Sequence, residues 1–302
     1  VSVIIPYSTW GAFFGGLLVA NGLAPEGQGL DTYISAIPYM LYAWVALLVV
    51  PLVIVGIIPG LGAMKKADHR AETTGQTVPP GAEHIERANL LIKPKPGIKP
   101  SMTLFVLPML SLVFLTLYFD NDFLKGVYVT LGATVAIILG LRMLNMNETF
   151  DTVIEGFKTM IEPLAVLVAA FIFKDVNDAL GLPAYVVQSI QPFLTADLLP
   201  TAIFVTMGLV SFATGSNWGV FVIILPIVAT LGNNLGADMT LCIGATLSAS
   251  TFGSHACFYS DSTVLSAQAS GTTTMQHALT QIPYALIGAA ITVVLYLLIA
   301  FI

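Results

Sequence analysis

The chain has 302 residues, of which 56% are hydrophobic and only 9% charged, with a formal net charge of −6. A mean hydropathy of +0.88 predicts an integral membrane protein. The sequence has no basic face for nucleic acid, and no nucleophile–base set, phosphate loop or metal cluster that would indicate an enzyme or a bound cofactor. Its two cysteines, Cys242 and Cys257, lie in apolar surroundings and are predicted to be packing residues.

The first predicted elements are apolar and interrupted by proline and glycine. Residues 1–23 form a broken or hairpin element, because Pro6 and several glycines fall inside it, and residues 34–58 form one long span. Further apolar stretches of about 20 residues predict a polytopic helical bundle. Because the chain starts at Val1 without a signal-peptide n-region, we expect that the N-terminal part of a longer protein precedes this sequence.

The middle of the chain is expected to form two parts. Residues 64–100 are the extended hydrophilic stretch and hold seven of the eleven Lys and Arg residues, so they are predicted to be a charged cytoplasmic loop. Residues 101–160 are predicted to form a helical hairpin and then an interfacial helix, because apolar residues recur at helical spacing among acids from Glu148 to Met160.

Candidate functional residues concentrate in residues 161–302, where the predicted spans become irregular. Lys174 and Asp178 have the spacing of an ion pair on one helix, and Asp175 lies between them. These three residues are candidates for proton coupling, although the helix can equally end here and leave them solvated. Residues 182–194 are too short to cross a membrane and predict a re-entrant hairpin.

Residues 198–231 are too long for one ordinary span and are broken by small and polar residues at 213–219. Half-helices that meet in a membrane expose the backbone groups with which transporters coordinate ions. Oxygen ligands from Thr214, Ser216 and Asn217 would suit a hard cation such as Na⁺. Small polar residues also let helices pack closely, so this break can serve packing alone.

A second polar stretch, residues 253–266, carries His255 and Asp261 between apolar segments. Ionisable side chains and unwound backbone at membrane depth are costly unless they line a cavity or bind something, so this stretch predicts an ion or substrate site. His255 is a candidate proton-responsive group, because histidine changes charge near neutral pH. The alternative is a buried histidine bonded to a neighbouring carbonyl.

Four ordered motifs resemble those of NhaC-type Na⁺/H⁺ antiporters. Phe212-Ala-Thr-Gly-Ser-Asn-Trp-Gly-Val-Phe221 resembles that family's Phe-Ala-Thr-Gly-Ser-Ser-Trp-Gly-Thr-Phe. The stretch Gly253-Ser-His-Ala-Cys-Phe-Tyr-Ser-Asp-Ser-Thr-Val-Leu-Ser266 is similar to its Gly-Asp-His-Cys-Ser-Pro-Ile-Ser-Asp-Thr-Thr-Ile-Leu-Ser. Residues 3–13 and 276–285 resemble two further family motifs, so the likeness covers most of the chain except the charged loop.

The resemblance implies an all-α polytopic membrane protein: an inverted-repeat secondary transporter with broken helices and re-entrant hairpins, homodimeric, in the cell inner membrane. Residues 1–63 would then contain the end of the first repeat and a following membrane helix, and residues 161–302 the second repeat with the transport site. Its partners would be the lipid bilayer, protons and a monovalent cation, Na⁺ or Li⁺, exchanged for each other. The implied ion centre comprises Ser260, Asp261, Ser262 and Thr263 from one break, and Ser216 and Asn217 from the other.

A carboxylate that binds either a cation or a proton, but not both, gives exchange by competition, and Asp261 is the candidate for that role. Two departures from the family pattern leave other functions open. Ser254 stands where the family has Asp, and Cys257-Phe258 where it has Ser-Pro, so one expected carboxylate is absent. An ion-coupled carrier of a small organic anion or amino acid is the second hypothesis, and a non-transporting membrane scaffold or sensor is the third.

Overall fold

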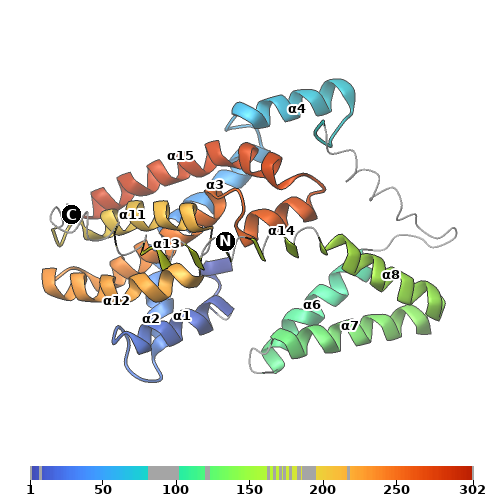
Figure 1. Ribbon diagram of the computed structural model, residues 1–302, viewed down its shortest axis with the longest axis horizontal. Coiled ribbons are helices and arrows are strands. Elements are labelled where there is room, and N and C mark those ends of the chain that lie inside the picture. Colours follow the sequence, from blue (N-terminus) through green and yellow to red (C-terminus); the bar gives the residue numbers. More distant parts are fainter. Residues whose placement is uncertain are drawn as a thin grey trace. The chain divides into compact units, whose positions relative to one another are not determined.

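The computed structural model describes residues 2–6, 9–80, 102–119, 123–161, 195–215 and 218–300, together with scattered positions between 164 and 185. Within these residues the regular elements are helices, which confirms the predicted all-α class for this part of the chain (Figure 1). The chain divides into two compact units. The first comprises Val1–Arg87 and Ala165–Ile302, and the second comprises Ala88–Leu164.

The first unit begins with two short helices in close contact. Helix α1 (Thr9–Ala20) follows the 3-10 helix η1 (Ser2–Ile4), and a turn leads to α2 (Gly29–Ala36). An added Cβ at Gly29 would lie 2.1 Å from the carbonyl oxygen of Gly15, so the two backbones touch at a point where only glycine fits. Helix α1 is continuous across the glycines that fall inside it, so the interruption predicted within residues 1–23 falls between η1 and α1.

The single span predicted at residues 34–58 is instead a bent pair of helices. The segment Gly29–Tyr39, which ends in the 3-10 helix η2 (Ile37–Tyr39), meets α3 (Leu41–Ile54) at an angle of 53°. Pro38 does not break the helical path, because it lies inside η2 and Ile37 before it keeps right-handed helical angles, with φ of −55° and ψ of −44°. The break falls at Met40, whose φ of −75° and ψ of 61° lie outside the helical region. Pro51 lies inside α3 near its end.

Part of the predicted charged loop is helical. Helix α4 (Gly62–Thr74) ends at Gly75, which adopts the left-handed conformation common at helix C-termini, with φ of 71°. Its start is tied to α15 (Thr274–Ala300), because the Tyr284 hydroxyl accepts a hydrogen bond of 2.9 Å from the backbone N–H of Leu61. The cytoplasmic location of this segment stays a prediction.

The second unit contains a helical hairpin and a third helix. Helices α6 (Thr103–Tyr118) and α7 (Phe123–Gly140) pack against each other, and α8 (Met146–Thr159) follows. Helix α8 starts with a capping box, in which Asn145 Oδ1 accepts from the backbone N–H of Glu148 at 2.9 Å and the Glu148 carboxylate accepts from that of Asn145 at 2.8 Å. The membrane-surface position of α8 stays a prediction.

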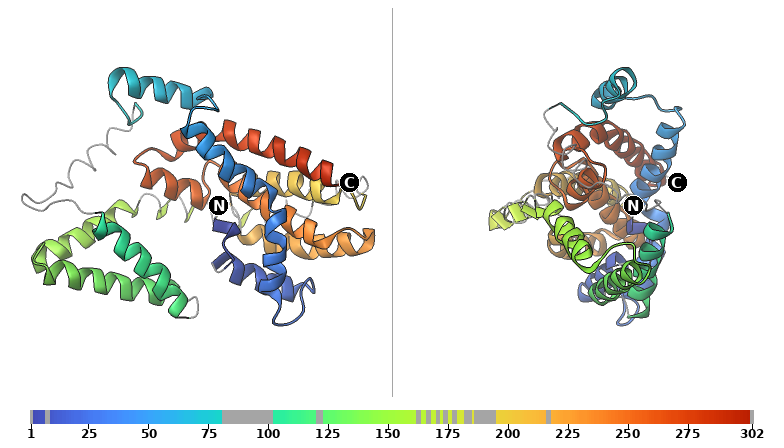
Figure 2. Two further views of the ribbon diagram at one scale, coloured as in Figure 1. Left: turned by 180° about the vertical axis from the view of Figure 1, so that it is seen from behind. Right: turned by 90° about the vertical axis from the view of Figure 1, so that its right-hand side faces the viewer.

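The remaining helices of the first unit surround α13 (Met239–Ala256). Helix α11 (Leu199–Thr214) makes its most extensive contact, and α12 (Trp218–Leu235), α14 (Asp261–Ala269), α15 and α3 also pack against it (Figures 1 and 2). Small residues in α13 let the surrounding helices approach its backbone closely. An added Cβ at Gly244 would lie 2.6 Å from the Cβ of Tyr39, for example.

By length and composition, α15 is the one described helix that could cross a membrane unaided. The bent pair formed by α2, η2 and α3 would make a second span if counted together. Helices α6, α7, α11 and α12 contain shorter apolar stretches.

Candidate functional site

The break between α11 and α12 packs directly against the break that follows α13. Gly215 ends α11 in the left-handed conformation, with φ of 64°, and an added Cβ there would lie 2.4 Å from the Tyr259 ring. The Tyr259 hydroxyl donates a hydrogen bond of 2.6 Å to the carbonyl oxygen of Ala213. This carbonyl lies in the last turn of α11, where carbonyls lack helical partners. The two breaks found separately in the sequence are therefore in contact.

The prediction that the helix is broken throughout residues 253–266 is wrong, because the break is much shorter. Helix α13 continues to Ala256, and the non-helical part is limited to residues 257–260, before α14 begins at Asp261. An added Cβ at Gly253 would lie 2.3 Å from the Cβ of Ser211 in α11. Gly253 thus allows close packing of two helices rather than ending one.

Four hydroxyl side chains gather where α13 ends and α14 begins, and we call Ser254, Ser260, Ser262 and Thr263 the hydroxyl cluster. The Oγ atoms of Ser254 and Ser262 are 2.5 Å apart. Ser260 Oγ lies 2.7 Å from the carbonyl oxygen of Ser254 and 2.9 Å from Thr263 Oγ1. Thr263 Oγ1 is also 2.9 Å from the carbonyl oxygen of Cys257. Ser254, Ser260 and Thr263 are buried.

The hydroxyl cluster has more capacity to accept than to donate hydrogen bonds. Each hydroxyl has one hydrogen and two lone pairs, and the nearby backbone carbonyls of Ser254 and Cys257 only accept. Oxygen atoms of this kind are the ligands that hard cations prefer. The cluster could therefore hold a small cation if its hydroxyl hydrogens pointed away from the ion and the oxygen lone pairs towards it.

Asp261 adds a carboxylate beside the hydroxyl cluster. It is the first residue of α14, and the preceding Ser260 caps this helix by accepting a 3.2 Å hydrogen bond from the backbone N–H of Thr263. The Asp261 Oδ1 atom accepts a 2.7 Å hydrogen bond from the backbone N–H of Ser262. The partial positive charge of the helix N-terminus favours a carboxylate here. The structure thus brings together four of the predicted ion-site residues, Ser260 to Thr263.

The other predicted ion-site residues are not all placed. Ser216 and Asn217 lie outside the described residues. Thr214 is buried at the end of α11, and its hydroxyl donates a 2.9 Å hydrogen bond to the carbonyl of Val210 in its own helix. Its Oγ1 atom keeps lone pairs for another donor or a cation. A ligand role for these three residues stays a prediction.

The candidate proton-coupling residues other than Asp261 differ in how far the structure describes them. Lys174 and Asp178 lie outside the described residues, so their pairing is a prediction, as is the role of Asp175. The ring of His255 has a partner that sequence reasoning missed: its Nδ1 atom lies 3.3 Å from the hydroxyl oxygen of Tyr42 in α3. No sequence pattern marked Tyr42 as a functional residue.

A polar network continues from Tyr42 across α13 to α15. The backbone N–H of Tyr42 donates to Ser248 Oγ at 3.3 Å. The Tyr296 hydroxyl lies 2.9 Å from the same Oγ atom and 2.7 Å from the carbonyl oxygen of Tyr39. Buried polar groups need such partners, because an unsatisfied one costs free energy. The network fixes how α3, α13 and α15 pack together.

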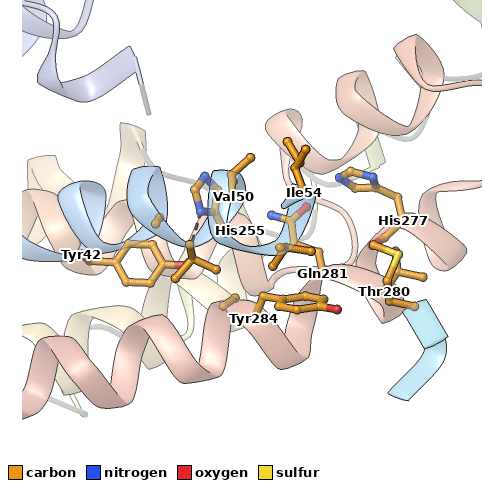
Figure 3. A pocket seen from close by; sticks show the side chains of 13 residues that line it. Tyr42, Val50, Ile54, His255, His277, Thr280, Gln281 and Tyr284 are labelled. Atoms are coloured by element: carbon orange, nitrogen blue, oxygen red, sulfur yellow. Dashed lines mark hydrogen bonds between the residues drawn. The ribbon is translucent and has the colours of Figure 1, made fainter. Parts of the chain in front are cut away.

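Next to this network, a cavity of about 390 Å³ opens between α3, α13 and α15, with Met64 of α4 also in its wall. His255 and Tyr42 line one part of it, and His277 and Gln281 of α15 line another (Figure 3). Its remaining walls are largely aliphatic. The sequence carried one usable signal for this cavity, the histidine His277 among the polar residues at the start of a long apolar segment.

In the described part of the chain, no three His, Cys, Asp or Glu side chains come together as a metal site. Cys242 and Cys257 are both buried and free.

Comparison with known proteins gives one family and two relatives. The model of the Na⁺/H⁺ antiporter family matches residues 1–301. An uncharacterized protein of Haemophilus influenzae is 29% identical over 170 residues, which cover 56% of this chain and 33% of that protein. The Malate-2H(+)/Na(+)-lactate antiporter of Bacillus subtilis is 24% identical over 168 residues, covering 55% of this chain and 36% of that protein. The chain thus spans about a third of the length of these curated relatives, and no solved structure matches it.

Proposed function

The chain belongs to the Na⁺/H⁺ antiporter family, a family of membrane transporters, and on this premise we propose that it exchanges Na⁺ or Li⁺ for protons. The observation that best supports this function is the hydroxyl cluster with the adjoining Asp261, which lies where the breaks of two helix pairs touch. In secondary transporters, irregular backbone at such breaks coordinates the transported ions.

The proposed exchange follows from competition at one carboxylate. The cation is bound by the Asp261 carboxylate, the hydroxyl oxygens of Ser260, Ser262 and Thr263, and the backbone carbonyl of Ser254. When a proton binds the carboxylate, its negative charge is lost and the cation is released. Ser216 and Asn217 complete the proposed site from the other break, and His255, Asp175, Asp178 and Lys174 remain candidates for carrying the proton onward.

Transport by the Asp261→Asn variant tests this function. The asparagine keeps the shape of the side chain but neither bears the charge nor takes up a proton. We expect it to abolish Na⁺- and Li⁺-dependent proton movement in proteoliposomes that contain the full-length protein. Asp31→Asn, at an exposed position in α2, is the matched control and should leave transport unchanged. Wild-type exchange rates in Asp261→Asn would contradict the proposal.

A second candidate function is ion-coupled transport of a small organic anion or amino acid. It is favoured by Ser254, which replaces a carboxylate of the family pattern, and by a relative described as a malate and lactate antiporter. A non-transporting scaffold or sensor is the third. Thermal stabilisation of the purified protein by Na⁺, Li⁺, carboxylates and amino acids separates the three functions. Stabilisation by the cations favours cation exchange, and stabilisation by an organic ligand favours the organic-substrate carrier. A melting temperature that no ligand changes favours the scaffold or sensor.

We also propose that the chain crosses the cell inner membrane several times as a homodimer, with inverted repeats and re-entrant hairpins, and that residues 64–100 are cytoplasmic. The shorter apolar helices and the bent α2–α3 pair are consistent with several crossings. A single reactive cysteine introduced at exposed Lys66 should be labelled by an impermeant maleimide from the cytoplasmic side only.

A further inference from the structure

The connector between α13 and α14, residues 257–260, contacts both halves of the proposed cation site. Its last residue, Ser260, belongs to the hydroxyl cluster. The residue before it, Tyr259, donates a 2.6 Å hydrogen bond to the carbonyl oxygen of Ala213 in the last turn of α11. The predicted ligands of the first break come just after Ala213 in the sequence, and they are Thr214, Ser216 and Asn217. Tyr259 is therefore placed to set the distance between the two halves.

The connector is firmly held on the side of the hydroxyl cluster. Ser260 Oγ lies 2.7 Å from the carbonyl oxygen of Ser254 and 2.9 Å from Thr263 Oγ1. Thr263 Oγ1 also lies 2.9 Å from the carbonyl oxygen of Cys257, so both ends of the connector are bonded. These bonds tie the connector to the end of α13 and the start of α14, and they leave Tyr259 little freedom to move away from the cluster.

The end of α11 is held less firmly by its own helix. The last carbonyls of a helix lack partners within it, and Gly215 ends α11 in the left-handed conformation. One turn earlier, α11 packs closely against α13, where Ser211 meets Gly253. Beyond that contact, the Tyr259 ring lies against Gly215 and its hydroxyl bonds to Ala213. Tyr259 thus anchors the part of α11 that leads into the first break.

A second side chain of the connector also touches α11. The rings of Phe258 and Phe212 have centroids 6.3 Å apart and planes at 64°. Aromatic rings attract each other over a range of separations, whereas a hydrogen bond weakens steeply when its geometry is lost. The hydrogen bond of Tyr259 therefore restricts the distance between the two breaks more sharply than the ring contact does.

Tyr259 is a departure from the family pattern. The motif that contains Asp261 has Ile at this position in the pattern, where this chain has Tyr259. An isoleucine side chain can pack against a neighbouring helix, but it has no hydroxyl to donate. The bond to the carbonyl of Ala213 thus depends on a side chain that the pattern does not supply.

Selectivity among cations of equal charge depends on the size and flexibility of the site and on the number of its ligands. A site whose halves are held at a fixed distance has to be stretched to admit a larger ion. We propose that Tyr259 is a positioning residue that sets the selectivity of the cation site, because it fixes the distance between the two breaks and so favours Li⁺ and Na⁺ over K⁺. Tyr259 acts here on the site of the proposed function, on which this inference rests, and its side chain is not a ligand of the ion.

The Tyr259→Phe variant tests this role, because it keeps the ring against Gly215 and removes only the hydroxyl. The measurement is equilibrium binding of Li⁺, Na⁺ and K⁺ to the purified full chain in detergent, by competition with radioactive Na⁺. We expect the ratio of the K⁺ to the Na⁺ dissociation constant to fall about 2- to 13-fold, because the bond cannot penalise the larger ion by more than its own contribution.

A hydrogen bond that only stabilises the fold would lower the melting temperature of Tyr259→Phe and leave this ratio unchanged. An unchanged ratio in the folded variant would therefore overturn the proposal. Tighter binding of all three cations with the same ratio would also overturn it, because the hydroxyl would then be blocking the carbonyl of Ala213 as a ligand.

Tyr296→Phe is the matched control. It removes the same kind of bond, 2.7 Å long, from a tyrosine hydroxyl to the carbonyl oxygen of Tyr39 at the bend between α2 and α3. We expect this variant to keep the wild-type ratio. If Tyr259→Phe does not fold, Phe258→Leu takes its place, because it loosens the other contact between the connector and α11. Its ratio should also fall, and a wild-type value would overturn the proposal.

This proposal and the proposed function can fail separately, because the ratio is a property of binding and not of transport. Wild-type protein that binds Na⁺ without exchanging it for protons contradicts the proposed function, and the ratio in Tyr259→Phe still decides the role of Tyr259. Exchange by the wild type with an unchanged ratio in Tyr259→Phe overturns that role alone. A wild-type protein that binds none of the three cations overturns both.

Discussion

Replacing Gly215 with alanine tests whether the two helix breaks are packed against each other. Two costs arise from the structure. A non-glycine residue in the left-handed conformation, here at φ of 64°, costs about 1–2 kcal/mol. The new Cβ would also lie 2.4 Å from the Tyr259 ring, and such overpacking costs about 1–3 kcal/mol more.

Gly236→Ala is the matched control for this variant. Gly236 has a similar φ of 69°, but an added Cβ there would meet no atom within 4 Å. Both variants therefore carry the backbone strain, and only Gly215→Ala carries the clash. We expect Gly215→Ala to be the less stable of the two by about 1–3 kcal/mol.

The apparent melting temperature of the detergent-solubilised full-length protein measures this difference. At about 2–4 °C per kcal/mol for a large domain, Gly215→Ala should melt several degrees below Gly236→Ala. Combining Gly215→Ala with Tyr259→Ala should remove the clash, so the effects of the two substitutions should not add. Equal melting temperatures for Gly215→Ala and Gly236→Ala, or strict additivity, would refute the contact between the breaks.

Three further predictions follow from single hydrogen bonds. Tyr42→Phe removes the hydroxyl partner of His255 and should cost about 1 kcal/mol of stability, seen as a lower melting temperature; an unchanged value would show that the bond contributes nothing. Asn145→Ala removes the capping box of α8 and should cost about 1 kcal/mol, whereas Asn147→Ala, two residues later and inside the helix, should cost less; equal losses by thermal unfolding would contradict the cap. Ser254→Ala keeps the proposed carbonyl ligand but removes the hydroxyl that lies 2.5 Å from Ser262 Oγ. It should weaken Na⁺ binding about 2- to 13-fold, as expected for one hydrogen bond of about 0.5–1.5 kcal/mol, and equilibrium binding that matches the wild type would show that this contact does not position Ser262 for the ion.

The breaks themselves were predictable from the sequence, because glycine and small polar residues inside apolar runs carry a local signal. Gly215 ends α11 as the polar run at 213–219 predicted. Ser260, Asp261, Ser262 and Thr263 are consecutive, so their grouping follows from adjacency alone. The extent of the second break was mispredicted, because Gly253 allows a close approach between helices, and sequence cannot tell that role from a helix end.

Features that depend on contacts distant in sequence could not be predicted. Tyr42 and His255 are 213 positions apart, and the Tyr42 hydroxyl carries no local signal of its partner. The bend between α2 and α3 falls at Met40, a residue type without a helix-breaking signal, whereas the two prolines of this segment, Pro38 and Pro51, both lie within helical turns. The helical part of residues 64–100 was missed because its charged composition is also typical of a loop.

Equilibrium binding of radioactive Na⁺ to the purified protein tests the central claim most directly, namely that Asp261 and the hydroxyl cluster form one cation site at which protons compete. We predict that wild-type protein binds Na⁺ and loses it as the pH is lowered, and that Asp31→Asn behaves in the same way. Asp261→Asn should bind no Na⁺ at any pH while remaining folded. Na⁺ binding in folded Asp261→Asn with the affinity and pH dependence of the wild type would contradict the account.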